Sequence, residues 1–211
     1  YGNNFDTFFD VGCHKGETIV LVNKIFSIKK IYAFDADANL IKKNKKSNPQ
    51  NVSFIDSGVG DFNGVRKMYK YKFSAINSLN NENYNSKYGK KRNKLLNLLY
   101  GNGNKKKEVK INLIKLDTFI KSEKIRRVDI LKIDTEGYEF NVVKGLSKEI
   151  NRVKIILFEH HFDNLLIKNY KFKDINNFLQ NNGFIKVYKT KMLFRKIFEY
   201  IYINKSIYGH E

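Results

Sequence analysis

The sequence has few of the residues that mark disulfide-rich, proline-rich or membrane-spanning proteins. Its 211 residues include one cysteine, one proline, two methionines and no tryptophan. A single cysteine, Cys13, excludes an internal disulfide and is compatible with a reducing compartment, so a cytoplasmic location is expected. No apolar run reaches the length of a membrane span, because the best candidate, residues 192–208, is interrupted by charged side chains.

Positive charge is abundant. The chain carries 40 Lys and Arg residues against 21 Asp and Glu residues, for a net charge of +19. Such a balance often indicates a polyanionic partner. Arginine is favoured for bidentate phosphate recognition, however, and here lysine dominates. The arginines are Arg66, Arg92, Arg126, Arg127, Arg152 and Arg195. We therefore consider dedicated nucleic-acid binding unlikely.

The length fits one domain over residues 1–211, with a core of its own. The sequence opens on Tyr1 inside a predicted strand, which indicates a fragment or a trimmed domain. It shows no internal repeats and no linker between domains.

The stretch 5–17, FDTFFDVGCHKGE, predicts a buried strand, a glycine turn and the start of a helix. An aromatic and β-branched run ends at Val11, Gly12 and Gly16 allow a tight turn with a close backbone approach, and the helix begins at Glu17. The buried face of this helix is expected to hold Ile19, Leu21, Val22, Ile25 and Phe26.

The glycine spacing indicates the kind of ligand. Asp10-x-Gly12-x-x-x-Gly16 departs from the Gly-x-Gly-x-x-Gly dinucleotide fingerprint, and no Walker lysine follows. Asp10, at a strand end facing a helix N-terminus, would repel a phosphate but suits a sulfonium. The turn, with Asp10, Gly12, Cys13 and Gly16, therefore favours S-adenosylmethionine (SAM) over NAD or ATP. A plain βα turn without a ligand is the alternative.

Acids also follow the next two predicted strands. Residues 30–34 form a strand that ends at Asp35, the place where nucleotide-binding folds hydrogen-bond ribose hydroxyls. Asp35 or Asp37 could instead cap the helix over residues 38–46, and both roles can hold together. A third strand, 52–55, is followed by Asp56 and Ser57.

The βα rhythm is interrupted between residues 64 and 116. Residues 65–73 and 108–116 alternate apolar and polar side chains, as half-exposed strands do. The polar segment 80–107 between them is too long for an ordinary connection, and leucines at 95–99 indicate a short helix within it. We expect a lid over the site or a disordered insertion.

The second half returns to alternating strands and helices. Helices are predicted from residue 116, over 138–146 and over 172–180. Strands are predicted over 128–133, 155–158 and 184–188, with a last one within 192–203. The whole pattern predicts one mostly parallel sheet covered on both faces. Ligands bind at the carboxyl ends of such strands, where Asp134, Glu136, Glu159 and His160 also lie.

Several blocks in this order resemble the FkbM-type SAM-dependent methyltransferases of the class I fold. The matching blocks are FDVGCHKGETI (9–19), YAFDADANLIKKN (32–44), VGDFNG (59–64), LDTFI (116–120), DILKIDTEGYEFNVVKGL (129–146) and IILFEHH (155–161). The block KIDTEGYE is the most specific of them. The chain departs from the family at Asp35-Ala36, where Glu-Pro is usual, and at His14, where Asn is common.

The resemblance implies a Rossmann-like α/β fold with a seven-stranded sheet, one strand of which is antiparallel. It implies methyl transfer, usually to a hydroxyl oxygen, with SAM as cofactor. Asp10, Gly12 and Gly16 would hold the methionine end of SAM, Asp35 the ribose, and Asp56 and Ser57 the adenine side.

The candidates for the base that accepts the hydroxyl proton are Asp134, Glu136 and His160. Asp134 is favoured because it ends the fourth strand, beside the transferred methyl group in this fold. Glu136 could instead cap the next helix. His160 and His161 cannot both face inward on a regular strand. A divalent cation on Asp134, Glu159 and His160 is possible but not favoured.

The expected acceptor is a sugar, a glycan or another small molecule. The alternatives are an RNA or protein methyltransferase that uses the basic surface, and a non-catalytic basic binding module on the same fold. Intact Asp10, Gly12, Gly16 and Asp35 speak against the last. The aromatic-Pro-Pro motif typical of nitrogen methylation is absent, since Pro49 is the only proline, and this favours oxygen as the acceptor.

Overall fold

The computed structural model describes residues 3–46, 49–70, 77–83, 85–100, 107–193 and 195–208. The elements in chain order are β1 (Asn4–Val11), α1 (Glu17–Ile25), β2 (Ser27–Asp35), α2 (Ala38–Lys45), β3 (Val52–Asp56), β4 (Gly58–Val59), β5 (Gly64–Lys70), α3 (Lys87–Tyr100), β6 (Lys107–Ile114), α4 (Leu116–Ser122), β7 (Val128–Ile133), α5 (Glu139–Lys144), the 3-10 helix η3 (Ser147–Arg152), β8 (Val153–His161), α6 (Phe172–Asn181), β9 (Phe184–Lys191), β10 (Ile197–Asn204) and α7 (Lys205–Tyr208).

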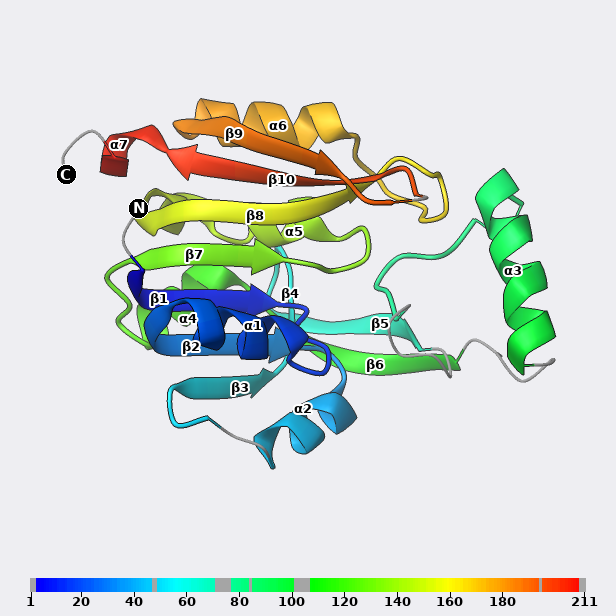
Figure 1. Cartoon of the computed structure of the whole chain (residues 1–211), viewed down its shortest axis with the longest axis horizontal. Coiled ribbons are helices and arrows are strands. Elements are labelled where there is room, and N and C mark those ends of the chain that lie inside the picture. The colour runs from blue at the N-terminus through cyan, green and yellow to red at the C-terminus, as the bar shows by residue number, and fades with distance from the viewer. Residues whose placement is uncertain are drawn as a thin grey trace.

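The main sheet has seven strands in the order β3-β2-β1-β7-β8-β10-β9 (Figure 1). Neighbouring strands from β3 to β8 pair in parallel, whereas β10 pairs antiparallel with both β8 and β9. The order reverses beside β1, so the carboxyl ends of β1 and β7 open a crevice at the switch point. The predicted fold class, including the single antiparallel strand, is confirmed.

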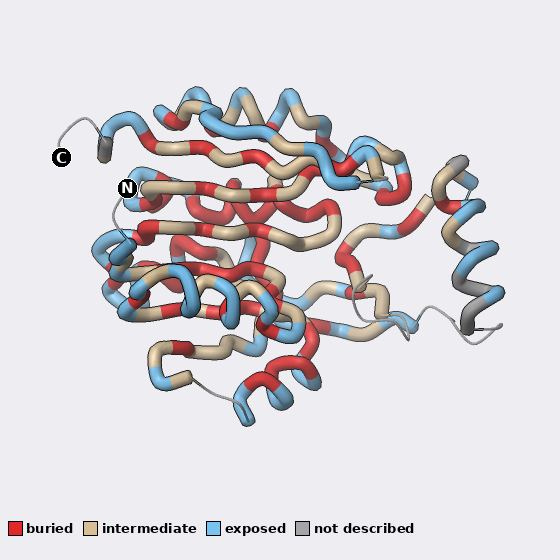
Figure 2. Tube along the Cα trace, viewed as in Figure 1, coloured by how far each residue is buried: buried red, intermediate tan, exposed pale blue. Residues whose placement is uncertain are grey.

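Helices cover both faces of this sheet. One core packs Ile19 of α1 and Ile41 of α2 against β1 and β2. A larger core on the other face joins α4, α5 and α6 to the sheet, through residues such as Phe119, Val142 and Ile175. Figure 2 shows buried positions running along the central strands.

The buried face of α1 is narrower than predicted. Ile19 is buried and Val22 and Phe26 are partly buried, but Leu21 and Ile25 are more than half exposed. The spacing 19, 22, 26 is one helical stripe, whereas positions 21 and 25 lie on the adjacent side. The prediction of a five-residue buried face was wrong because one sheet contacts only one stripe of a nine-residue helix.

Strands β4, β5 and β6 form a separate small sheet, which the sequence did not predict. Its order is β4-β6-β5, with β5 and β6 antiparallel. The predicted strands at 65–73 and 108–116 correspond to β5 and β6, although residues 71–73 lie outside the described part and β6 ends at Ile114. They pair with each other, and β6 also pairs with β4.

The segment 80–107 contains the helix expected there. Ser86 caps α3, because its hydroxyl accepts a hydrogen bond from the Gly89 amide at 3.0 Å. α3 lies beyond the carboxyl ends of the parallel strands, apart from the main sheet (Figure 1). Residues 84 and 101–106 of this segment lie outside the described residues.

Over the described ranges, no helix is both long enough and apolar enough to cross a membrane.

Candidate active site

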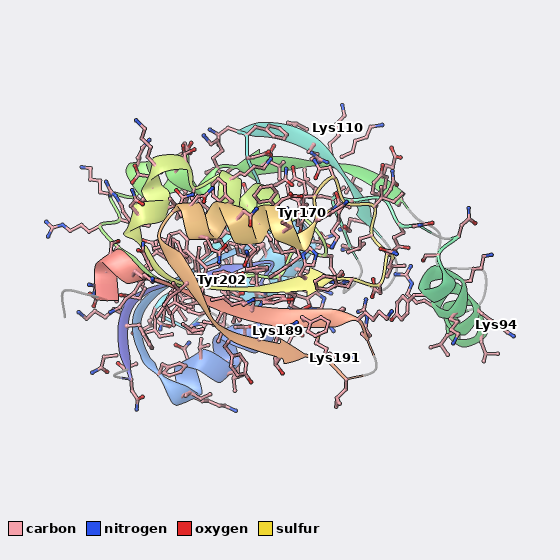
Figure 3. All side chains as sticks on the ribbon, turned by 90° about the horizontal axis from the view of Figure 1, so that it is seen from above. Lys94, Lys110, Tyr170, Lys189, Lys191 and Tyr202 are labelled. Atoms are coloured by element: carbon pink, nitrogen blue, oxygen red, sulfur yellow. The ribbon has the colours of Figure 1, made fainter. Side chains whose placement is uncertain are left out.

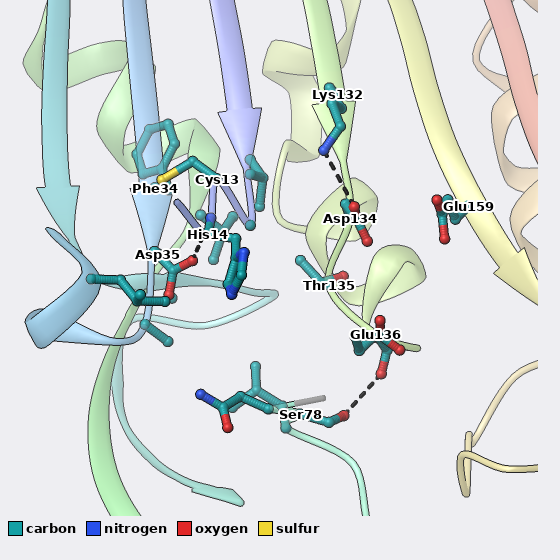
Figure 4. A pocket seen from close by; sticks show the side chains of 18 of the residues that line it. Cys13, His14, Phe34, Asp35, Ser78, Lys132, Asp134, Thr135, Glu136 and Glu159 are labelled. Atoms are coloured by element: carbon teal, nitrogen blue, oxygen red, sulfur yellow. Dashed lines mark hydrogen bonds and ion pairs between the residues drawn. The ribbon is translucent and has the colours of Figure 1, made fainter. Parts of the chain in front are cut away.

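A cavity of about 410 Å³ lies at the carboxyl ends of the parallel strands (Figure 4). Its volume lies in the range typical of sites for small molecules and cofactors. Seven residues singled out in the sequence line it: Gly12, Cys13, Asp35, Ser57, Asp134, Glu136 and Glu159. Four others do not line it: Asp10, Gly16, Asp56 and His160.

The glycine turn after β1 packs directly against the end of β7. Gly12 has φ +83°, and a Cβ atom at this position would lie 1.9 Å from the carbonyl oxygen of Asp134. The amides of Gly12 and Cys13 both donate to the carbonyl oxygen of Phe34, at 2.9 and 3.0 Å. The close approach that Gly12 allows is therefore to another part of this chain, and it brings the β1 turn and Asp134 together.

Asp10 lies beneath the cavity rather than in its wall. It is fully buried, and its carboxylate lies 3.4 Å from the Nζ of Lys132. The same Nζ lies 3.4 Å from Asp134, so Lys132 joins the two acids. Burial alone would lower the pKa of Lys132, but the two carboxylates more than offset this and raise it. Asp10 is thus already paired with a cation of the protein.

Asp35 forms the opposite wall and organises its own surroundings. One carboxylate oxygen accepts the amide of His14 at 2.9 Å, and the other accepts the amide of Asp37 at 2.8 Å. Burial raises the pKa of Asp35, although these two amides counteract it. Each oxygen has a further lone pair for a ligand hydroxyl. Asp37 caps α2 by accepting the amide of Asn39, so the cap predicted for Asp35 or Asp37 is made by Asp37.

Asp56 and Ser57 were both predicted for the adenine side. Asp56 is the last residue of β3, and Ser57 follows it. Ser57 lines the cavity, and its hydroxyl donates to the carbonyl oxygen of Asp56 at 2.7 Å. The Asp56 side chain is exposed and lies outside the cavity wall. Of the two, only Ser57, the first residue after the strand, reaches the site.

The loop after β7 is held in a strained shape. Glu136 has φ +49°, a left-handed conformation that side chains other than glycine rarely adopt. The fully buried Glu139 carboxylate accepts hydrogen bonds from the Gly137 amide at 2.8 Å, the Thr135 hydroxyl at 3.2 Å and the Tyr170 hydroxyl at 2.6 Å. Strain of this kind persists where the surroundings determine the conformation, and it is common at active sites.

Glu159 faces the cavity from the end of β8. Burial raises its pKa to about 7, and the nearby carboxylates of Asp134 and Glu199 act in the same direction. A carboxyl group with such a pKa can exchange protons near neutral pH.

His160 points away from the cavity, because it alternates with Glu159 along β8. Its ring lies edge-on to Phe162, Tyr170 and Phe172, and its Nε2 is 3.2 Å from the Nζ of Lys168. Burial, followed by the Lys168 charge, lowers the pKa of His160 to about 3. The structure therefore does not bring His160 together with the other predicted catalytic residues.

The alternative metal set is not assembled either. Asp134 and Glu159 line the cavity, but His160 lies on the other face of β8. Among the residues that the structure describes, no group of three His, Cys, Asp or Glu side chains is placed to hold a metal ion.

Several residues of the site were not found from the sequence. Lys132 and Arg195 bring positive charge into the cavity wall, and Asn77, Ser78 and Leu79 form part of that wall just before the insertion. Lys132 lies two positions before Asp134 on a strand, so period-two alternation could have placed both on one face. Arg195 follows a long strand, and no local pattern marks it.

Arg195 connects three parts of the chain around the cavity. Its guanidinium lies 3.2 Å from a carboxylate oxygen of Asp163, after β8, and 5.1 Å from the ring centre of Tyr88 on α3. The start of the insertion is also fixed nearby, because the amide of Asn83 donates to Leu165 at 2.6 Å. Tyr88 of the insertion thus contacts Arg195, a residue of the cavity wall.

The strand order of the main sheet, with β10 as its one antiparallel strand and a crevice at the switch point beside the acid that ends β2, is that of the class I fold of SAM-dependent methyltransferases. The model of the FkbM methyltransferase domain matches residues 10–186. The chain belongs to this family, so the predicted family is confirmed. No curated protein sequence matches the chain.

Solved structures show the same fold at low sequence identity. A methyltransferase FkbM from Methylobacillus flagellatus has a TM-score of 0.55 and 11% identity over 95% of this chain and 44% of its own. TrmK from M. capricolum, solved with S-adenosylhomocysteine (SAH), has a TM-score of 0.54 and 9% identity over 95% of this chain and 63% of its own. An rRNA methylase from Streptococcus thermophilus has a TM-score of 0.51 and 9% identity over 95% and 87%. The chain thus spans less than two thirds of the first two.

Proposed function

We propose that the protein binds SAM in this cavity and transfers its methyl group to a hydroxyl oxygen of a sugar, a glycan or another small polar molecule. The observation that carries the proposal is the division of one cavity into two sides. One side has Asp35 beside the glycine turn, and the other has Asp134, Glu136 and Glu159 (Figure 4).

The residues on the first side fit the cofactor. Asp35 offers lone pairs to ribose hydroxyls, because each of its oxygens accepts one amide among the residues that the structure describes. Gly12 and Cys13 lie next to it, and burial raises the pKa of the Cys13 thiol, which keeps that side chain neutral. Ser57 is proposed for the adenine side. SAM, when bound, supplies an electrophilic methyl group on a sulfonium.

Asp10 and Gly16 have indirect roles in this proposal. Asp10 holds Lys132, and Gly16 starts α1 with φ +82°. Asp56, exposed outside the cavity, is given no contact with SAM.

The residues on the second side position the acceptor and take its proton. Carboxylates accept hydrogen bonds from the hydroxyl groups of polar acceptors, and positioning supplies much of the acceleration in methyl transfer. Asp134 and Glu136 both reach the cavity from the loop after β7, and either can accept a proton. The insertion 80–107 is proposed as a lid or an acceptor-binding element, since its Tyr88 contacts Arg195 of the cavity wall.

The test is incubation of the purified protein with methyl-labelled SAM and pools of small glycans, RNA and protein, followed by mass spectrometry of the products. The expected result is label on oxygen in the glycan or small-molecule pool. Label found only in RNA or only in protein would replace the proposed acceptor. Failure of the folded protein to bind SAM or SAH would overturn the proposed function itself.

A further inference from the structure

The histidine that faces the cavity side of β8 is His161, not His160. Alternation along the strand places His161 on the same side as Glu159. Its side chain is 1% exposed, and its Nε2 lies 3.5 Å from a carboxylate oxygen of Glu136. Neither ring nitrogen forms a hydrogen bond among the described residues, so the contact with Glu136 is one of proximity. A buried imidazole without such a partner is rare, so its position beside Glu136 calls for a role.

Glu136 is held in place by contacts to its backbone. The Ser78 hydroxyl donates to the Glu136 carbonyl oxygen at 2.8 Å, and the Asn80 side-chain amide donates to the carbonyl oxygen of Gly137 at 2.6 Å. The amide of Gly137 is bonded to Glu139 on α5. The left-handed backbone at Glu136 is thus fixed from two sides, and its side chain lines the cavity 25% exposed.

Burial and the neighbouring charges set how tightly each group of the pair binds a proton. Burial raises the pKa of Glu136 well above its usual range, with further contributions from Asp134, Glu139 and Glu159, and Arg195 opposes them. Once deprotonated, a carboxylate with a raised pKa is a stronger base than an ordinary one. Burial also lowers the pKa of His161. The charged groups that act on His161 are Glu139, Asp163, Arg195 and Lys168.

Asp134 is placed differently. Its carboxylate lies 3.4 Å from the Lys132 ammonium. No lysine of the described ranges pairs with Glu136 in this way, and its neighbour His161 has a ring that can donate or accept a proton. The two carboxylates of the β7 loop therefore differ in what they can do.

We propose that Glu136 accepts the proton of the hydroxyl acceptor and that His161 is its positioning residue, donating from Nε2 to the Glu136 carboxylate. This rests on the proposed function. The acceptor oxygen forms a bond to the methyl carbon, the carbon–sulfur bond breaks with its electron pair left on sulfur, and the hydroxyl proton passes to Glu136. Asp134, tied to Lys132, supplies negative charge opposite the sulfonium.

The first test needs no acceptor. Nitrogen-15 NMR of the histidine rings, in the full chain saturated with SAH, reports which ring nitrogen carries the proton. The sequence has four histidines, so assignment is simple, and His160 is an internal reference in the same spectrum. We expect the Nε2-protonated form of His161 in the wild type and a different ring signal in Glu136→Ala. Identical His161 signals in the two proteins would overturn the pairing.

The second test compares variants once a product has been identified. His161→Leu removes the donor, whereas His161→Gln keeps an amide that can donate. We expect kcat to fall about 10²-fold for Leu, as for a misplaced reacting group, and less for Gln, with SAH binding unchanged. The acid limb of the pH–rate profile should move in His161→Leu, and a purely structural role would leave it in place.

Glu136→Gln and Asp134→Asn then separate the two carboxylates. A loss of about 10²–10⁴-fold in kcat for Glu136→Gln supports the proposal. A loss of that size for Asp134→Asn, with Glu136→Gln nearly silent, would overturn it and make Asp134 the base. Because SAH binding and the NMR signals do not depend on turnover, failure of this pair is distinguishable from failure of the proposed function.

Discussion

The backbone of Gly12 packs directly on the carbonyl oxygen of Asp134, and a Cβ atom at position 12 would lie 1.9 Å from that oxygen. The amide of Asp134 in turn donates to the carbonyl oxygen of Val11 at 2.9 Å. Gly12 and Asp134, both proposed for the site, are therefore held together by backbone contacts between the ends of β1 and β7.

Gly12→Ala should be severely destabilising. The substitution adds a clash with backbone to an unfavourable φ, and we expect a loss of at least about 3 kcal/mol in the free energy of unfolding, measured by urea denaturation. Gly16→Ala is the matched control, since φ is +82° but the nearest atom to its Cβ is Ile19 Cδ1 at 3.8 Å. It should lose only about 1–2 kcal/mol. Equal losses would contradict the role of the Asp134 contact.

Asp35→Ala should weaken SAH binding by about 1–3 kcal/mol, the scale of a lost hydrogen bond to a charged group. Calorimetry on the folded domain measures this. Asp56→Ala is the control, because this neighbouring strand-end acid is exposed outside the cavity and should leave affinity unchanged. If both variants weakened SAH binding equally, Asp35 would not be the residue that binds the ribose.

Lys132→Met should destabilise the fold by about 3–5 kcal/mol, because it leaves Asp10 buried without a cation. The Lys132 side chain is 17% exposed and Asp10 is 0% exposed. Lys144→Met is the comparison: its ion pair with Asp61 is 2.8 Å long, but the side chains are 36% and 28% exposed. That loss should stay below about 1 kcal/mol. A Lys132 variant as stable as the wild type would show that Asp10 is protonated in the fold.

The pKa of about 7 at Glu159 predicts a specific pH dependence of stability. A carboxyl whose folded pKa is raised above its ordinary value stabilises the fold while protonated. This contribution is complete below the unfolded value, 4.5, and is lost as the pH rises through about 7. Glu159→Gln should remove this pH dependence. Between about pH 5 and pH 8, the free energy of unfolding of the variant should therefore rise relative to that of the wild type by about 1–3 kcal/mol. Parallel stability curves would refute the raised pKa.

The helix α3 should exchange its amide hydrogens faster than β1 or β7 in the protein without ligand. Among the side chains of α3 that the structure describes, Leu95 and Leu98 are 54% and 82% exposed, and exposed apolar positions of this kind add little to local stability. A segment that acts as a lid or binds the acceptor should become more protected with SAH and acceptor present. If the amides of α3 were as protected as those of the central strands in the protein without ligand, this role would be excluded.

The sequence allowed the class of fold and most elements to be predicted, because those depend on local patterns. Strand and helix periodicity located the seven strands of the main sheet, and the glycine turn with Asp35 marked its binding edge. The short strand β4, and the small sheet that it forms with β5 and β6, were not predicted. A strand of two residues shows no periodicity, and strand pairing depends on residues far apart in the chain.

The predicted residues Asp35 and Asp134 line the cavity, because a position at the carboxyl end of a parallel strand decides their surroundings. His160 does not line it, because it alternates along β8 with Glu159, which does, and the exposed Asp56 also lies outside the wall. The prediction also missed Lys132 and Arg195, whose partners are distant in sequence. The types of side chain suggested which chemistry the site could perform. Only the pairing of the strands showed which of two adjacent side chains faces the cavity.

By itself, the sequence determined the alternation of strands and helices, the family and the edge of the sheet where a ligand binds. These follow from hydrophobic periodicity and from glycines that only certain turns require. Tertiary structure alone decided that Lys132 joins Asp10 to Asp134, that Glu136 adopts a strained backbone, and that His161 meets it. Each of these depends on distances between segments far apart in the chain, which are set when the sheet is assembled and its faces are buried.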